Sequence, residues 1–254
     1  MTTPLAYEDS GGSGPAVVFI HGFPLTGGMW KAQLQAVRGK ARAIAFDVRG
    51  FGASPAGDGQ YLFETFVDDL LGLLDQLKIE KAALCGLSMG GYVALRAAEK
   101  APGRVSGLLL CDTRSDTDSN ESKLKRHAAM ALVKAKGVAA LADAFLPSVL
   151  APGSPGADEA RRLTLTNGPI GICGSLLAMA TRTDTTESLS KIAVPTSVLV
   201  GEKDALTPPE LARALAARVP GASCEVIAGA SHLSNLDRPE EFNRHLLAFV
   251  GKLR

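Results

Sequence analysis

The stretch Gly86-Leu87-Ser88-Met89-Gly90 places a serine between two glycines in the pattern G-x-S-x-G. It follows an apolar run and opens a run with helical spacing, the context that is typical of a nucleophile elbow. In such a cramped strand-to-helix turn, only glycine leaves room for the backbones to pass closely at positions 86 and 90. The pattern therefore indicates a nucleophilic Ser88; the alternative is a glycine-rich turn whose serine only caps a helix.

A serine hydroxyl is a poor nucleophile at neutral pH and needs a histidine base. Among the four histidines, His232 lies in a loop of small residues between the last predicted strand and the last predicted helix. That loop lies at the sheet edge where Ser88 should emerge. His127 and His245 stand beside basic residues on predicted helices, so we expect them at the surface. His21 precedes the nucleophile, and we expect it to brace a loop.

An acid is needed to hold the base in the correct tautomer. Asp204 follows an apolar predicted strand that ends at Val200, so it reaches the same edge of the sheet. The order Ser88, Asp204, His232 is the order nucleophile, acid, base found in one large class of hydrolases. Asp112, which directly follows another predicted strand, is the rival acid. We prefer Asp204, because a turn with a glycine can swing it toward the His232 loop.

A tetrahedral intermediate also needs two backbone N–H groups aimed at its oxyanion. Met89, the residue after the nucleophile, is expected to supply one of them. The second should come from a loop after an earlier strand, which fits His21-Gly22-Phe23-Pro24 with Phe23 as the donor.

The elements that must position these residues alternate between strands and helices. Runs that are apolar on both faces predict buried parallel strands: Ala16–Ile20, Ala41–Phe46, Lys81–Cys85, Val105–Cys111, Pro195–Val200 and Ser223–Ile227. Apolar residues every three or four positions predict helices: Met29–Val37, Tyr61–Leu77, Met89–Lys100, Pro209–Ala217 and Pro239–Leu253. This alternation predicts an α/β fold, a mostly parallel sheet with helices on both faces.

One long stretch interrupts the alternation, because residues 113–192 contain no convincing strand. Helical patterns at Lys123–Lys136 and Val138–Phe145 are followed by a segment rich in proline and glycine, which favours short helices joined by turns. We interpret 113–192 as a helical cap inserted into a core of residues 1–112 and 193–254. An insert after a strand's carboxyl end would cover the edge where open α/β sheets bind ligands.

Apolar residues of this cap and of the edge loops are candidates to line a substrate pocket. With 5% aromatic residues the pocket should be mostly aliphatic, which favours short to medium acyl chains. The candidates are Trp30, Phe145, Leu146, Leu176, Met179, Leu206 and Leu233.

Composition excludes several other classes of protein. The 254 residues are 46% hydrophobic and carry a net charge of +1, which argues against disorder and against binding of nucleic acids. No apolar run approaches the roughly 20 residues of a membrane helix. The stretch Met1–Asp9 lacks the features of an export signal, so we predict a cytoplasmic location. The four cysteines lack paired metal spacing and are predicted to be free thiols, and no metal or cofactor is expected.

Taken together, these features resemble the α/β-hydrolase superfamily, and within it the small bacterial carboxylesterases related to 3-oxoadipate enol-lactonases and cofactor-free haloperoxidases. The resemblance covers essentially the whole chain. It implies a helical cap after Asp112, a metal-free site and hydrolysis of esters or lactones. It rests on His21-Gly22-Phe23-Pro24, Arg49-Gly50-Phe51-Gly52-Ala53-Ser54, Gly86-Leu87-Ser88-Met89-Gly90-Gly91, Cys111-Asp112-Thr113-Arg114, Asp204 and Ser231-His232.

Three functions stay open at this point. The first is a serine carboxylesterase that forms an acyl-enzyme on Ser88. The second is a lactonase for an anionic substrate, which would need a cation near the pocket; Arg114 and Arg182 are candidates, although pairing with Asp116 or Asp184 is the simpler expectation. The third is a ligand receptor that keeps the pocket without the chemistry. The sequence predicts a small-molecule ester or lactone as partner and leaves open a monomer or a small homo-oligomer.

Overall fold

A single sheet runs through the computed structural model, which describes residues 4–253. Residues 1–3 and 254, at the ends of the predicted core segments, lie outside the described part. Within it the strand order is β1-β3-β2-β4-β5-β6-β7, and only β1 runs antiparallel to its neighbour. The strands are β1 (Tyr7–Asp9), β2 (Ala16–Ile20), β3 (Arg42–Phe46), β4 (Ala82–Leu87), β5 (Val105–Cys111), β6 (Thr196–Gly201) and β7 (Ser223–Ile227).

The strand predictions are confirmed for β2 to β7, with ends that move by at most two residues. Strand β1 was not predicted. It has three residues, pairs only with β3 at the sheet edge, and has Tyr7 and Glu8 exposed, so it carries no apolar run that a pattern could detect.

Helices cover the sheet on both faces, as the alternation predicts. Successive strand residues face opposite ways: Val18 and Ile20 pack in one core with helices α2, α3 and α7, while Val17 and Phe19 pack in another with α1 and α9. The helices of the two layers are α1 (Lys31–Ala36), α2 (Phe63–Gln76), α3 (Met89–Lys100), α7 (Pro209–Arg218) and α9 (Pro239–Val250), with short turns η1 (Gly27–Trp30), η2 (Pro102–Arg104) and α8 (Ser234–Asp237).

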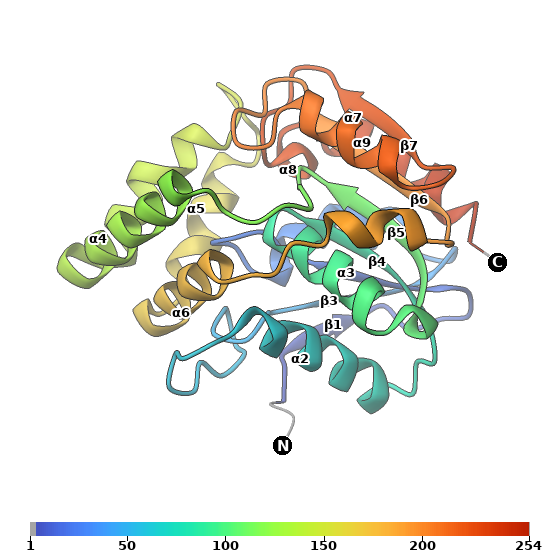
Figure 1. The fold of residues 1–254 in the computed structure, drawn as a ribbon, viewed down its shortest axis with the longest axis horizontal. Helices are drawn as coiled ribbons and strands as arrows, with labels where there is room; N and C mark the ends of the chain where they lie inside the picture. Colours follow the sequence, from blue (N-terminus) through green and yellow to red (C-terminus); the bar gives the residue numbers. More distant parts are fainter. Residues whose placement is uncertain (1–3, 254) are drawn as a thin grey trace.

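The segment between β5 and β6 is helical and contributes no strand within residues 113–192. Where two helices were expected, α4 (Asn120–Phe145) continues through both, but Gly137 interrupts it with φ 79° and ψ 177°, a conformation that only glycine adopts readily. Helices α5 (Ala157–Leu165) and α6 (Pro169–Ala180) follow, with turns η3 (Leu146–Ser148) and η4 (Thr186–Lys191). Helices α4, α5 and α6 gather at one side of the sheet, on the left of Figure 1.

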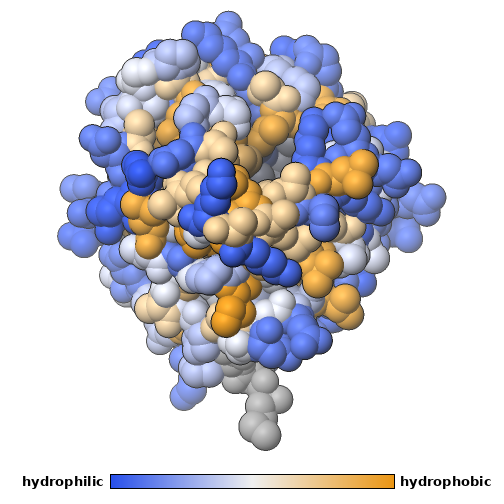
Figure 2. Space-filling view, turned by 90° about the vertical axis from the view of Figure 1, so that its left-hand side faces the viewer, coloured by the Kyte–Doolittle hydropathy of each residue, from blue (hydrophilic) through white to orange (hydrophobic). Residues whose placement is uncertain are grey.

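The outer face of these helices mixes polar and apolar residues. Figure 2 shows orange apolar side chains scattered among charged ones on this side of the molecule. Exposed apolar residues on the three helices include Leu124, Leu165, Ile170 and Leu177. Among the described residues no single helix is long and apolar enough to cross a membrane; α5 and α6 reach that length only together, across a bend of 104°.

Candidate active site

Strand β4 and helix α3 hold Ser88 in the strained turn that the G-x-S-x-G pattern predicts. Ser88 has φ 52°, in the left-handed region that residues other than glycine rarely adopt. A Cβ on residue 86 would overlap the carbonyl group of residue 90, and a Cβ on residue 90 would overlap the carbonyl group of Ile20. Both glycines are therefore required where the three backbone segments cross.

One hydrogen-bonded chain connects Ser88, His232 and Asp204. Ser88 Oγ donates to His232 Nε2 at 2.8 Å, and His232 Nδ1 lies 2.8 Å from Asp204 Oδ2. His232 and Asp204 are each 2% exposed, whereas Ser88 is partly exposed. The turn after β6 holds the carboxylate, because the backbone N–H groups of Leu206 and Thr207 both donate to Asp204 Oδ1 at 2.9 Å.

The two ionisable members of this chain change each other's pKa. Burial works to lower the pKa of His232, but the charge of Asp204 and the hydrogen bond to it outweigh burial and raise that pKa. Burial works to raise the pKa of Asp204, but the charge and hydrogen bond of His232 and the hydrogen bonds of Thr207 lower it. The site therefore keeps Asp204 ionised and makes His232 a stronger base than a free imidazole.

The other histidines take no part in this chain. His21 is fully buried, donates from Nδ1 to the carbonyl of Gly22 at 3.1 Å, and accepts from the N–H of Val48 at Nε2 at 2.9 Å. Burial lowers the pKa of His21 to about 4, so it stays neutral and braces its loop, as expected from sequence. His127 is exposed on α4, and His245 is half-buried on α9.

Two backbone N–H groups beside Ser88 are available to hold an oxyanion. Met89 is the first residue of α3, where helix N–H groups have no partner in their own helix. Phe23 lies in the loop after β2, beside the same cavity as Ser88. In the described part of the chain, neither N–H donates a hydrogen bond to another group. Unpaired and buried backbone donors are rare, and both groups are free to donate a hydrogen bond.

A cavity of about 440 Å³ opens beside Ser88 and His232. Four of the sequence-predicted lining residues, Phe145, Leu176, Met179 and Leu206, lie in its wall. Leu141 and Ala129, both on α4, extend this apolar part.

The expectation is wrong for Trp30, Leu146 and Leu233, which do not line this cavity. All three belong to the core between the sheet and α1 and α9. The Trp30 ring packs 5.3 Å from that of Phe19 and 5.9 Å from that of Phe242. All three are buried in that core, which their places in the sequence alone do not reveal.

Another part of the cavity wall is polar and cationic, and most of its residues were not predicted from the sequence. Lys125 and Arg126 lie one helical turn after Ser122 on α4, and Asp118 and Arg114 line the same cavity. This spacing was visible, but which face of the helix looks into a cavity was not.

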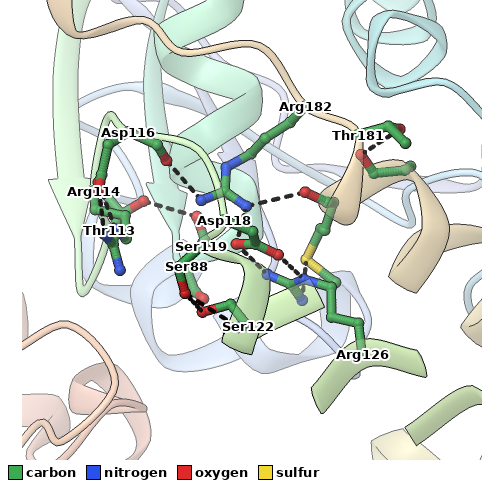
Figure 3. A network of polar contacts seen from close by, with 12 residues as sticks. Ser88, Thr113, Arg114, Asp116, Asp118, Ser119, Ser122, Arg126, Thr181 and Arg182 are labelled. Atoms are coloured by element: carbon green, nitrogen blue, oxygen red, sulfur yellow. Dashed lines mark hydrogen bonds and ion pairs between the residues drawn. The ribbon is translucent and has the colours of Figure 1, made fainter. Parts of the chain in front are cut away.

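Two of the arginines share one carboxylate. Figure 3 shows Asp118 between Arg126 and Arg182. Arg182 is 5% exposed and does not line the cavity; its guanidinium donates to Asp118 at 2.5 Å and lies 4.0 Å from the centre of the Tyr92 ring.

Arg114 lines the cavity and pairs with Asp116, as the simpler expectation had it, whereas Arg182 pairs with Asp118 and not with Asp184. One of the two positive charges around Asp118 is left without a matching carboxylate.

The helical segment also fixes the loop of the base. The N–H of Leu233 donates to the carbonyl of Val149 at 3.0 Å, and the N–H of Ala151 donates to the carboxylate of Asp237. The same carboxylate accepts the N–H of Ser231 at 2.7 Å. Residues 149–151 are therefore joined to the loop that carries His232.

Comparisons with known proteins agree with this architecture. The model of the alpha/beta hydrolase family matches residues 17–245. The chain is 28% identical over 242 residues to 3-oxoadipate enol-lactonase 2 of Acinetobacter baylyi, covering 94% of this chain and 89% of that protein. It is 33% identical to a non-heme chloroperoxidase of Kitasatospora aureofaciens, over 97% of this chain and 95% of that protein.

Among solved structures, a thermophilic esterase from Thermogutta terrifontis with malate bound has a TM-score of 0.93 and 38% identity, covering 98% of this chain and 93% of that one. The mostly parallel sheet, the strained serine turn and these matches define an α/β hydrolase. The chain belongs to the alpha/beta hydrolase family, and the resemblance inferred from the sequence is confirmed.

Proposed function

We propose that this protein is a serine carboxylesterase that cleaves esters of short to medium acyl chain through an acyl-enzyme on Ser88. The observation that carries the proposal is the hydrogen-bonded chain Ser88–His232–Asp204 beside a cavity with two free backbone donors. The similarity to an esterase over almost the whole chain supports it.

The proposed reaction has two steps. His232 Nε2 takes the proton of Ser88 Oγ while Oγ attacks the ester carbonyl carbon, and the N–H groups of Phe23 and Met89 stabilise the oxyanion. His232 then gives its proton to the departing alcohol, which leaves the acyl group bonded to Ser88. Water attacks this acyl ester, loses a proton to His232, and releases the acid as the proton returns to Ser88.

We also propose that residues 113–192 act as a cap over this cavity. The proposal is supported by the cavity residues that the segment contributes, Leu141, Phe145, Leu176 and Met179 among them, and by its hydrogen bonds to the His232 loop. The apolar lining favours an acyl chain without charge in that part of the cavity. The cytoplasmic location stays a prediction from the sequence, and a monomer or a small homo-oligomer stays open.

A lactonase for a carboxylate-bearing substrate is the second candidate. It is favoured by the polar wall, where Arg126 donates from Nη1 only to the thioether of Met179 at 3.3 Å, a weak acceptor that a carboxylate could replace. The similarity to enol-lactonases and to an esterase that holds malate supports it. A ligand receptor without chemistry is the third, and it would bind an ester and release it unchanged.

The experiment that separates the three is hydrolysis of a chromogenic ester series from acetyl upward, beside a carboxylate-bearing lactone, with and without a chelator. Turnover of short neutral esters, unaffected by the chelator, supports the esterase. Strong preference for the lactone would favour the lactonase. A folded protein inert on both would contradict the hydrolase proposals.

A further inference from the structure

Asp112, the rival acid in sequence, is buried in the site without a place in the proposed reaction. It is 0% exposed, and no hydrogen bond joins it to His232 among the described residues. Its carboxylate instead has two other partners. Oδ1 accepts the backbone N–H of Gly201 at 2.8 Å, and Oδ2 accepts the hydroxyl of Ser234.

These two partners belong to the two loops that carry the acid and the base. Gly201 ends β6, and its carbonyl accepts the N–H of Asp204 at 3.1 Å, so it anchors the turn of the acid. Ser234 begins α8, two residues after His232. One carboxyl group therefore fastens both loops to the end of β5.

The neighbours of Asp112 fasten the nucleophile in the same way. The carbonyl of Cys111 accepts the N–H of Ser88 at 2.9 Å, and the hydroxyl of Thr113 donates to the carbonyl of Ser88 at 2.9 Å. Residues 111–113 thus bind the segments of all three members of the proposed chain. Asp112 adopts φ 48° to do so, a left-handed conformation that Asp and Asn tolerate better than other side chains.

We propose that Asp112 is a positioning residue that sets the distance and angle between Asp204 and His232 by hydrogen-bonding to Gly201 and Ser234, and that it does not act as a second acid. The inference rests on the proposed function. Burial, and after it the negative charge of Asp204, raise the pKa of Asp112 well above its usual range, which supports a role as a hydrogen-bonding group without charge.

The test compares three substitutions at this position on a chromogenic ester. Asp112→Asn keeps an oxygen to accept from Gly201 and tolerates the left-handed backbone. Its amide nitrogen can only donate, so the contact with Ser234 is kept with the direction reversed, the Ser234 hydroxyl oxygen accepting. We expect its kcat within about threefold of wild type. Asp112→Ala and Asp112→Gly remove both contacts, and we expect kcat to fall about 10- to 100-fold with KM within about threefold, since small misplacements in a catalytic group are costly. Glycine relieves the backbone strain that alanine adds, so equal losses assign the effect to the contacts.

Two further variants keep the test informative if alanine or glycine prevents folding, which thermal unfolding reveals. Ser234→Ala removes one of the two contacts and should lower kcat less than Asp112→Gly does. Lys78→Gly, at another left-handed position with φ 54°, introduces glycine in the connection between α2 and β4, outside the cavity wall, and should leave kcat unchanged.

The results distinguish a failure of the proposed function from a failure of the positioning role. A wild type that cleaves no ester contradicts the proposed function, and the Asp112 series is then read on the lactone. With an active wild type, unchanged kcat in Asp112→Gly and Ser234→Ala would overturn the positioning role. A loss in Asp112→Asn as large as that in Asp204→Asn would show a charged acid instead.

Discussion

The hydroxyl of Thr207 donates to Asp204 Oδ2 at 2.6 Å, on the same oxygen that faces His232 Nδ1. Thr207 is 2% exposed, three residues after the acid, and its backbone N–H holds the other carboxylate oxygen. This side chain therefore fixes the direction in which Asp204 presents its charge.

Removal of the Thr207 hydroxyl should loosen that orientation. Thr207→Val keeps the shape and loses a hydrogen bond to a charged group, and we expect kcat/KM on a chromogenic ester to fall about tenfold. Thr207→Ser restores a hydroxyl and should recover most of the rate. Wild-type activity in the valine variant would mean that the backbone N–H groups alone orient Asp204.

The raised pKa of His232 predicts the acid side of the pH profile. His232 must be neutral to accept the proton of Ser88, so kcat/KM should fall as pH drops through a midpoint above the ordinary histidine value of 6.5. In Asp204→Asn the main charge that raises this pKa is gone and burial lowers the pKa, so the midpoint should move to lower pH while kcat falls about 10⁴-fold. A midpoint that stays in place or moves to higher pH in this variant would contradict the pairing.

The crossing of backbones at the serine turn predicts a stability effect. Gly90→Ala drives a Cβ into the carbonyl group of Ile20, which the backbone can relieve only by moving, and we expect a loss of about 1–3 kcal/mol in the free energy of unfolding. Gly103→Ala is the matched control, because a Cβ there meets nothing within 4 Å. Denaturant unfolding of both variants measures the difference, and equal stabilities would argue against the tight crossing.

The sequence could predict the core of the fold because its strands are apolar on both faces. It also predicted Ser88, Asp204 and His232 at one sheet edge, since each lies within five residues after the end of a predicted strand. The edge strand β1 was not predicted, because a largely exposed run of three residues has no detectable hydrophobic periodicity. The cavity wall was predicted only in part. Helix spacing does not say which face of α4 turns inward, so Arg126 was not predicted to line the cavity. Trp30 was wrongly included because its place in the sequence does not show that its side chain packs in the core.

The unmatched positive charge beside Asp118 predicts a substrate preference. We expect the aryl monoester of glutaric acid to be cleaved with a lower KM than the aryl ester of pentanoic acid, which has the same chain length without the carboxylate. Arg126→Gln should remove most of this preference and leave kcat on the neutral ester nearly unchanged. Lys125→Gln is the control; Lys125 also lines the cavity, but it is exposed and pairs with Glu121 at 2.8 Å. Equal KM values for the two esters in wild type would exclude the anion subsite.

The formation of a covalent bond to Ser88 tests the central claim most directly. The protein is treated with an aryl fluorophosphonate, digested, and examined by mass spectrometry, with Ser88→Ala and Ser122→Ala in parallel; Ser122 is a second serine in the same cavity. We predict one adduct on the peptide that contains Ser88 in wild type and in Ser122→Ala, and neither adduct nor ester hydrolysis in Ser88→Ala. An adduct on Ser122, or retained ester turnover in Ser88→Ala, would contradict the assignment of Ser88 as nucleophile.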